Sequence, residues 1–129
     1  MGIKILVVDD EPDVRDLLAN LLADAGYEIE EMTDGRDIVA RATSWRPALI
    51  ILDLTMPNVD GFEALKLLKA DPRTAGIPVI VASAQTQKET LVSVGDLGAA
   101  DFLVKPWEPG EAEWRVGQCL KLCSEERAA

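Results

Sequence analysis

Carboxylates, an amine and a hydroxyl group follow directly after short apolar runs in this chain. The residues concerned are Asp9, Asp10, Asp53, Ser83 and Lys105. Carboxylate oxygens bind hard divalent cations such as Mg²⁺, and a carboxylate can itself act as a nucleophile and form an acyl phosphate. Brought together with an ammonium group, these side chains would suit phosphoryl transfer, in which positioning and charge neutralisation do most of the work.

Each of these residues also has an ordinary structural explanation. An Asp after a strand often ends the strand and caps a turn, and Ser is common in turns. Asp9 and Asp10 could cap the first helix, and Lys105 could be a surface lysine whose stem lies along apolar neighbours. The chemical interpretation therefore depends on whether the surrounding elements place these residues at one edge of the fold.

The pattern of apolar residues predicts five strands. Three are apolar runs typical of strands buried on both faces of a parallel sheet. The second strand is more polar and partly alternating, as edge strands are, and the fifth is short. The predicted strands are residues 3–8, 27–32, 49–52, 77–82 and 102–104.

Predicted helices separate these strands. The first begins at Pro12, where the missing N–H costs nothing, and ends before Gly26, which suits a left-handed cap. Its apolar residues recur at helical spacing and form one stripe; they are Val14, Leu17, Leu18, Leu21, Leu22 and Ala25. The other helices are expected near residues 38–42, 62–68, 87–97 and 109–123, with a polar tail over 124–129.

The alternation of strands and helices determines the topology. Strands separated by helices must run parallel with right-handed crossovers, and the polar second and short fifth strands belong at the edges. The result is a doubly wound five-stranded α/β sheet with strand order 2-1-3-4-5. In such a sheet the C-terminal ends of the strands lie along one rim, so that rim would carry all of the candidate residues.

Three carboxylates on one rim repel one another. Two unit charges ~5 Å apart cost about 3 kcal/mol at an effective dielectric constant of 20. Lys105 supplies one positive charge, and a divalent cation is the natural second. An all-oxygen site favours Mg²⁺, or Mn²⁺, over Zn²⁺.

The composition of the chain excludes some classes of binding partner and chemistry. The 129 residues suit one domain, and 13 basic against 23 acidic residues give a net charge of −10, which disfavours binding to nucleic acid or anionic membranes. Histidine is absent, so the chain cannot carry a phosphohistidine.

No apolar run is long enough to span a membrane, and the N-terminus lacks the features of a signal peptide. We therefore expect a cytoplasmic protein.

Several residues of the later helices carry packing expectations. Leu91, Val92 and Val94 are the apolar residues of the weak fourth helix. The core stripe of the last helix is expected to be Ala112, Val116, Cys119 and Cys123, with the cysteines as small apolar residues rather than metal ligands. Trp45 and Trp107 are expected to be packing residues. Trp114 lies off that stripe, and an exposed Trp there would indicate a contact surface.

The residues at the strand ends, taken in order, resemble the receiver domain of bacterial two-component response regulators. The resemblance covers about residues 3–123 and is specific because all its pieces occur in order. The matching pieces are Val7-Val8-Asp9-Asp10-Glu11, Leu52-Asp53-Leu54-Thr55-Met56-Pro57 with Asp60-Gly61, Ala82-Ser83-Ala84, and Gly98-Ala99 with Lys105-Pro106. The resemblance implies a (βα)5 flavodoxin-like fold, with residues 1–123 as a receiver domain and no output domain present in the chain.

The resemblance also implies roles for the rim residues. Asp53 would accept a phosphoryl group, and Asp9 and Asp10 would hold Mg²⁺ with Asp53 and the backbone carbonyl of Thr55. Lys105 would pair with the phosphoryl oxygens. The Lys105–Pro106 peptide bond is expected to be cis. Ser83 would bond a phosphoryl oxygen after a small shift of its strand end.

The same resemblance implies partners and an output surface. The phosphoryl donor would be a sensor histidine kinase or a histidine phosphotransfer protein. Phe102 holds the place of an aromatic residue that swings inward on phosphorylation, but it lacks the hydroxyl of a Tyr. The changed surface, formed by the fourth helix, fifth strand and fifth helix, would bind a protein target or a second copy of the chain. Thr55 and Gln85 border the site and would tune dephosphorylation.

Three other functions remain open from the residues. A magnesium-dependent phosphatase with an aspartate nucleophile would want a second Asp two residues after Asp53, where Thr55 stands. A flavin- or nucleotide-binding sheet would want a first loop rich in Gly, Ser or Thr. A receiver-like module that is never phosphorylated would not need the complete set of acids. We expect a regulatory phosphoacceptor domain rather than an enzyme, either standing alone or as part of a longer protein.

Overall fold

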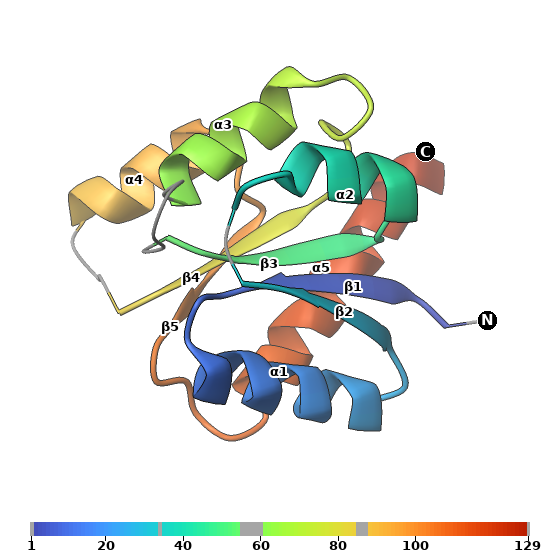
Figure 1. The fold of residues 1–129 in the computed structure, drawn as a ribbon, viewed down its shortest axis with the longest axis vertical. Coiled ribbons are helices and arrows are strands. Elements are labelled where there is room, and N and C mark those ends of the chain that lie inside the picture. The colour runs from blue at the N-terminus through green and yellow to red at the C-terminus, as the bar shows by residue number, and fades with distance from the viewer. Residues whose placement is uncertain (1, 34, 55–60, 85–87, 129) are drawn as a thin grey trace.

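The computed structural model describes residues 2–33, 35–54, 61–84 and 88–128. Within these residues, five strands alternate with five helices, as Figure 1 shows. The strands are β1 (Lys4–Val8), β2 (Glu28–Met32), β3 (Leu49–Asp53), β4 (Val79–Ser83) and β5 (Asp101–Val104). The helices are α1 (Pro12–Asp24), α2 (Ile38–Trp45), α3 (Gly61–Ala70), α4 (Lys88–Asp96) and α5 (Glu111–Ala128).

The strands form one parallel sheet in the order β2-β1-β3-β4-β5. The predicted topology and the predicted edge strands are therefore confirmed. The register pairs Val8 with Leu52, and Asp53 with Ala82, so the C-terminal ends of β1, β3 and β4 lie level with one another. This alignment is what gathers the strand-end residues along one rim.

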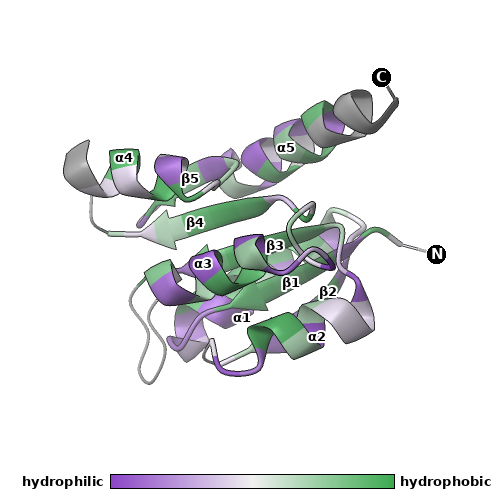
Figure 2. Ribbon diagram, turned by 90° about the horizontal axis from the view of Figure 1, so that it is seen from above, coloured by the Kyte–Doolittle hydropathy of each residue, from purple (hydrophilic) through white to green (hydrophobic). Residues whose placement is uncertain are grey.

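Helices cover both faces of the sheet (Figure 1). On one face, α2, α3 and α4 bury Ile38, Leu65 and Val94 against the strands. On the other, α1 and α5 bury Leu18, Leu22 and Val116. Figure 2 shows β3 and β4 in green between helices that carry purple, hydrophilic patches. The near-continuous apolar strands are thus buried from both sides, as doubly wound sheets require.

The packing expectations for the aromatic residues and the cysteine hold. Trp45 packs against the core under α2 and α3, and Trp107 packs against the core under α1 and α5. Trp114 is 62% exposed. Cys119 is buried in the core stripe of α5, whereas the side chain of Cys123 lies outside the described residues.

Two expectations about the helices are wrong. Leu17 belongs to the predicted apolar stripe of α1 but is exposed rather than part of the core. The apolar stripe of α1 is wider than the face that the sheet and the neighbouring helices cover. The last helix continues to Ala128 instead of ending at Cys123, because polar residues can extend a helix into solvent once its inner end is packed. No helix in the described part of the chain is long and apolar enough to cross a membrane.

Candidate functional site

The candidate site lies at the C-terminal ends of β1, β3, β4 and β5. Asp9 and Asp53 are nearly fully buried, at 2% and 3% exposed, and Ser83 is buried beside them. Ser83 pairs with Val104 across the β4–β5 ladder, and its carbonyl accepts a 2.9 Å hydrogen bond from the backbone N–H of Lys105. Four neighbouring strands thus bring their terminal residues together.

Asp9 is fixed by contacts on every side. Its backbone N–H donates to the carbonyl of Met32 on β2 at 3.1 Å, and its Oδ1 accepts from the backbone N–H of Glu11 at 2.9 Å. Its Oδ2 accepts from Nζ of Lys105 at 2.9 Å. Both oxygens of this buried carboxylate therefore accept a hydrogen bond.

Lys105 places one ammonium group among three carboxylates. Nζ lies 2.9 Å from Asp9 Oδ2, 3.4 Å from Asp53 Oδ1 and 3.4 Å from Glu11 Oε1. Burial lowers the pKa of the Lys105 amine, but the hydrogen bond to Asp9 and the charges of Asp53, Asp9 and Glu11 outweigh it, so the pKa lies above its usual value. The lysine is therefore charged throughout the physiological range. The Lys105–Pro106 peptide bond is cis, as expected.

The acids at this rim have the composition of a site for a hard cation. Asp9, Asp10, Glu11 and Asp53 each offer one oxygen, and these oxygens all lie within 4.8 Å of one another. Among the described residues, no group donates a hydrogen bond to the buried Oδ1 of Asp10. One ammonium against four carboxylates leaves an excess of negative charge, which fits Mg²⁺ or Mn²⁺ and its preference for oxygen ligands.

The structure brings together Asp9, Asp10, Asp53, Ser83 and Lys105, as the topology predicted. The proposed metal ligand Thr55 and the neighbouring Gln85 lie outside the described residues. Two further residues contact the site, and no sequence motif predicted a role for either. Glu11 approaches Lys105, and Arg15 Nη1 donates to the carbonyl of Asp9 at 3.0 Å.

The sequence sets Arg15 apart by its charge but does not show which acceptors it contacts. Arg15 is the only basic residue of α1 and stands four residues after Glu11, one helical turn along the chain. In the structure its backbone N–H donates to the carbonyl of Glu11 at 2.9 Å. Arg15 is thus a lone positive charge close in the chain to three acids, and the packing of α1 decides which acceptors it reaches.

An apolar hollow of about 340 Å³ opens beside Lys105. It is lined by Glu11, Val14, Leu17, Ala84, Lys105, Pro106 and Trp107. Leu17 is about half exposed, so this hollow offers apolar surface directly next to a charged site.

Comparisons with known proteins assign the fold and the family. Residues 5–116 match the sequence profile of the response regulator receiver domain. The chain is 37% identical over 126 residues to the chemotaxis protein CheY of Thermotoga maritima, covering 96% of this chain and 99% of CheY. The structure of the chemotaxis response regulator CheY4 of Vibrio cholerae superimposes with a TM-score of 0.86 at 32% identity, covering 92% of this chain and 99% of CheY4.

A longer relative matches over part of its length. The DNA-binding dual master transcriptional regulator RpaA of Synechocystis sp. is 40% identical over 118 residues, which is 92% of this chain and 49% of RpaA. The chain thus spans about half the length of that regulator and nearly the whole of CheY.

Proposed function

Because the chain belongs to the response regulator receiver domain family, we propose that it is a phosphoacceptor switch of a two-component phosphorelay. The observation that carries the proposal is the buried carboxylate of Asp53, 3.4 Å from the ammonium of Lys105, within a cluster of acids suited to a divalent cation. The proposed donor is a phosphohistidine on a sensor kinase or on a phosphotransfer protein.

The proposed reaction uses few groups of this chain. An oxygen of Asp53 forms a bond to phosphorus while the bond from phosphorus to the donor's imidazole nitrogen breaks. Lys105 neutralises charge on the transferred group, and Ser83 donates a hydrogen bond to one of its oxygens. Asp9, Asp10 and Asp53 would hold Mg²⁺, with the carbonyl of Thr55 as a further ligand. The cation would supply charge neutralisation on the phosphoryl oxygens.

A protein donor needs surface to bind beside Asp53. The hollow beside Lys105, with Leu17 and Trp107 on its walls, provides apolar contact area at that place. The strongly negative chain disfavours nucleic acid as a direct partner. Any DNA binding, which RpaA has by its name as a DNA-binding regulator, would belong to a separate output domain.

The proposed output surface comprises α4, β5 and α5. Exposed apolar side chains occur on all three elements: Leu91, Val92, Val104, Trp114 and Leu122. Phe102 on β5 packs partly buried against the core under α2, α3 and α4, a position from which it could follow a movement of Ser83. Shifting a two-state domain from 1:99 to 99:1 requires about 5.5 kcal/mol, to which the new contacts of Ser83 and Lys105 would contribute.

Intact mass spectrometry tests the proposal. The parent and Asp53→Asn are incubated with acetyl phosphate, with and without Mg²⁺. We expect the parent to gain one phosphoryl group only with Mg²⁺ and the variant to gain none. Continuous release of phosphate from phosphate esters would instead indicate an aspartate-nucleophile phosphatase. A parent that stays unmodified, both with acetyl phosphate and with a phosphorylated kinase domain, would point to a module that only binds partners.

A further inference from the structure

Arg15 ties the loop that carries the acid pair to the edge of the sheet. Its Nη1 donates to the backbone carbonyl of Asp9 at 3.0 Å, and its Nε lies 3.7 Å from Oε1 of Glu31 on β2. The side chain is only 16% exposed. A guanidinium group presents several donors in a fixed plane, which suits such a bridge between two acceptors.

The carbonyl that Arg15 holds belongs to the peptide unit joining Asp9 to Asp10. Because that unit is planar, fixing its oxygen also fixes the direction in which the backbone enters Asp10. The other contacts of Asp9 act on its carboxylate and its own N–H. Among the described residues, none donates to the buried Oδ1 of Asp10. Since no described hydrogen bond holds that oxygen, its direction depends on how the backbone places Asp10.

We propose that Arg15 is a positioning residue for the metal site: by holding the Asp9–Asp10 peptide against β2, it directs the Asp10 carboxylate toward the cation. This inference rests on the proposed function, since it assumes that the acid cluster binds Mg²⁺. Residues that orient metal ligands without touching the metal typically change its affinity by about 10–100-fold when replaced.

The charge of Arg15 has the opposite effect to its positioning role. A positive group near the acids repels a cation, so charge alone predicts that removing Arg15 strengthens Mg²⁺ binding. Positioning predicts that removal weakens binding. The sign of the change in Mg²⁺ affinity therefore distinguishes the positioning effect from the charge effect. Arg15→Lys keeps the charge but loses the planar guanidinium group, so it provides a second test of positioning.

The chain offers a matched control. Arg41 on α2 forms an ion pair with Glu30, the residue next to Glu31, so it contacts the same edge strand. None of the contacts described for Arg41 involves the loop of Asp9 and Asp10. Arg41→Gln thus removes one positive charge and one ion pair to β2 without changing a described contact of the acid loop.

The test measures Mg²⁺ affinity directly, without a phosphoryl donor. Backbone amide NMR shifts of the parent, Arg15→Gln, Arg15→Lys and Arg41→Gln are followed during titration with MgCl₂, and unfolding free energies are measured separately without Mg²⁺. We expect the dissociation constant to rise about tenfold in Arg15→Gln, a few-fold in Arg15→Lys, and not at all in Arg41→Gln. If Arg15→Gln does not fold, Arg15→Lys carries the test.

The outcomes separate this inference from the proposed function. Unchanged or tighter binding in the Arg15 variants, with normal binding by the parent, would overturn the positioning role alone. A parent that binds no Mg²⁺ would overturn both the inference and the metal site of the proposed function. A loss of stability in Arg15→Gln with unchanged affinity would show that the residue serves the fold only.

Discussion

At the scale of the residue, Lys105 supplies positive charge that offsets the repulsion among the clustered carboxylates when no cation is bound. Its ammonium lies 2.9 Å from the Asp9 carboxylate and 3.4 Å from the Asp53 carboxylate. Removing one partner of a buried pair leaves an uncompensated charge and costs about 3–5 kcal/mol. The lysine therefore stabilises the fold as well as the proposed phosphorylated state.

Replacing Lys105 with Met is expected to lower the free energy of unfolding by about 3 kcal/mol in the absence of divalent cations. Because its pKa is raised in the folded state, the lysine's contribution is fully present below the unfolded value of 10.5 and is lost only as the pH rises through the higher folded value. The loss should therefore be constant across neutral pH. Urea unfolding measures it, with the exposed Lys66→Met on α3 as control. Equal stability of the two variants would contradict this role.

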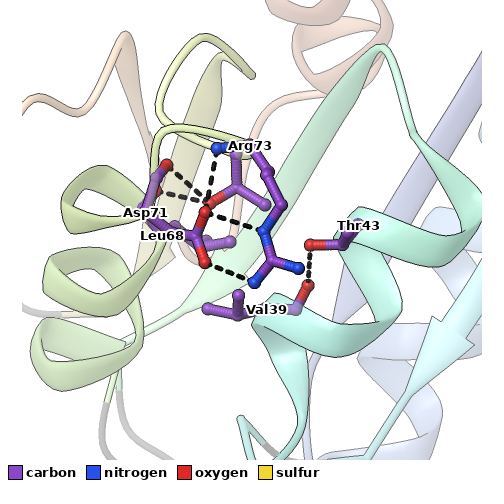
Figure 3. Close-up of polar contacts among 6 residues, drawn as sticks. Val39, Thr43, Leu68, Asp71 and Arg73 are labelled. Atoms are coloured by element: carbon purple, nitrogen blue, oxygen red, sulfur yellow. Dashed lines mark hydrogen bonds and ion pairs between the residues drawn. The ribbon is translucent and has the colours of Figure 1, made fainter.

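Asp71 and Arg73 form a second pair of charged residues, after the end of α3 (Figure 3). The Asp71 carboxylate accepts hydrogen bonds from the side chain of Arg73 and from its backbone N–H at 2.8 Å. These contacts lower the pKa of Asp71 to about 2. Since the folded pKa is depressed, the stabilisation is present above the unfolded value of 3.8 and is lost as the pH falls through about 2.

In Arg73→Gln the pKa of Asp71 is expected to rise toward 3.8 without reaching it, because the backbone N–H bond remains. Carboxyl ¹³C NMR of the two proteins checks this. At about pH 3 a carboxyl of pKa 2 is roughly nine-tenths ionised, and the variant should be ionised clearly less. Identical titration curves would show that the Arg73 side chain has no influence.

At the scale of the element, the start of α3 lies directly against the end of β3. The N–H of Gly61 donates to the carbonyl of Leu54 at 2.8 Å. A Cβ atom at Gly61 would lie 2.4 Å from the Asp53 carbonyl oxygen and 2.3 Å from Leu54 Cα. Only glycine permits this approach, so α3 and the candidate phosphoacceptor are positioned by the same contact.

Gly61→Ala is therefore expected to destabilise the fold by about 2 kcal/mol or more, through forced backbone movement, and to reduce phosphorylation of Asp53. Gly117→Ala on α5 is the matched control. A Cβ at Gly117 meets nothing within 4 Å, and Ala in a helix is worth about 1 kcal/mol over Gly, so this variant should be more stable. Thermal unfolding and phosphorylation with acetyl phosphate measure both effects. A Gly61→Ala variant as stable as the parent would disprove the steric argument.

At the scale of the whole molecule, folding gathers acids that lie far apart in the chain. Asp9 and Asp10 come from the end of β1, and Asp53 comes from the end of β3, more than forty residues later. The unfolded chain has no such cluster. A cation that binds the cluster therefore binds the folded state selectively and stabilises it by mass action.

Mg²⁺ at about a hundred times its dissociation constant is expected to raise the free energy of unfolding by about 2.7 kcal/mol. Chemical unfolding with MgCl₂, compared with NaCl at equal ionic strength, measures this. Asp10→Asn should lose most of the increment, because it removes one of the clustered carboxylates. An equal effect of both salts on the parent would mean that only general screening is at work.

The sequence alone determined the architecture and most of the site. Apolar strand runs separated by amphipathic helices permit one parallel order, and that order places Asp9, Asp53 and Lys105 on one rim. Local patterns suffice here because the period of apolar residues and the rules of chain connection fix which ends of the strands meet.

Only the tertiary structure decided the remaining features. Leu17 belongs to the apolar stripe of α1 yet is exposed, because the width of the covered face depends on how α1 meets its neighbours. The contacts of Glu11 with Lys105, and of Arg15 with Asp9 and Glu31, also emerged only there. A long charged side chain can reach many acceptors, and the packing of helix, loop and edge strand selects the ones it contacts.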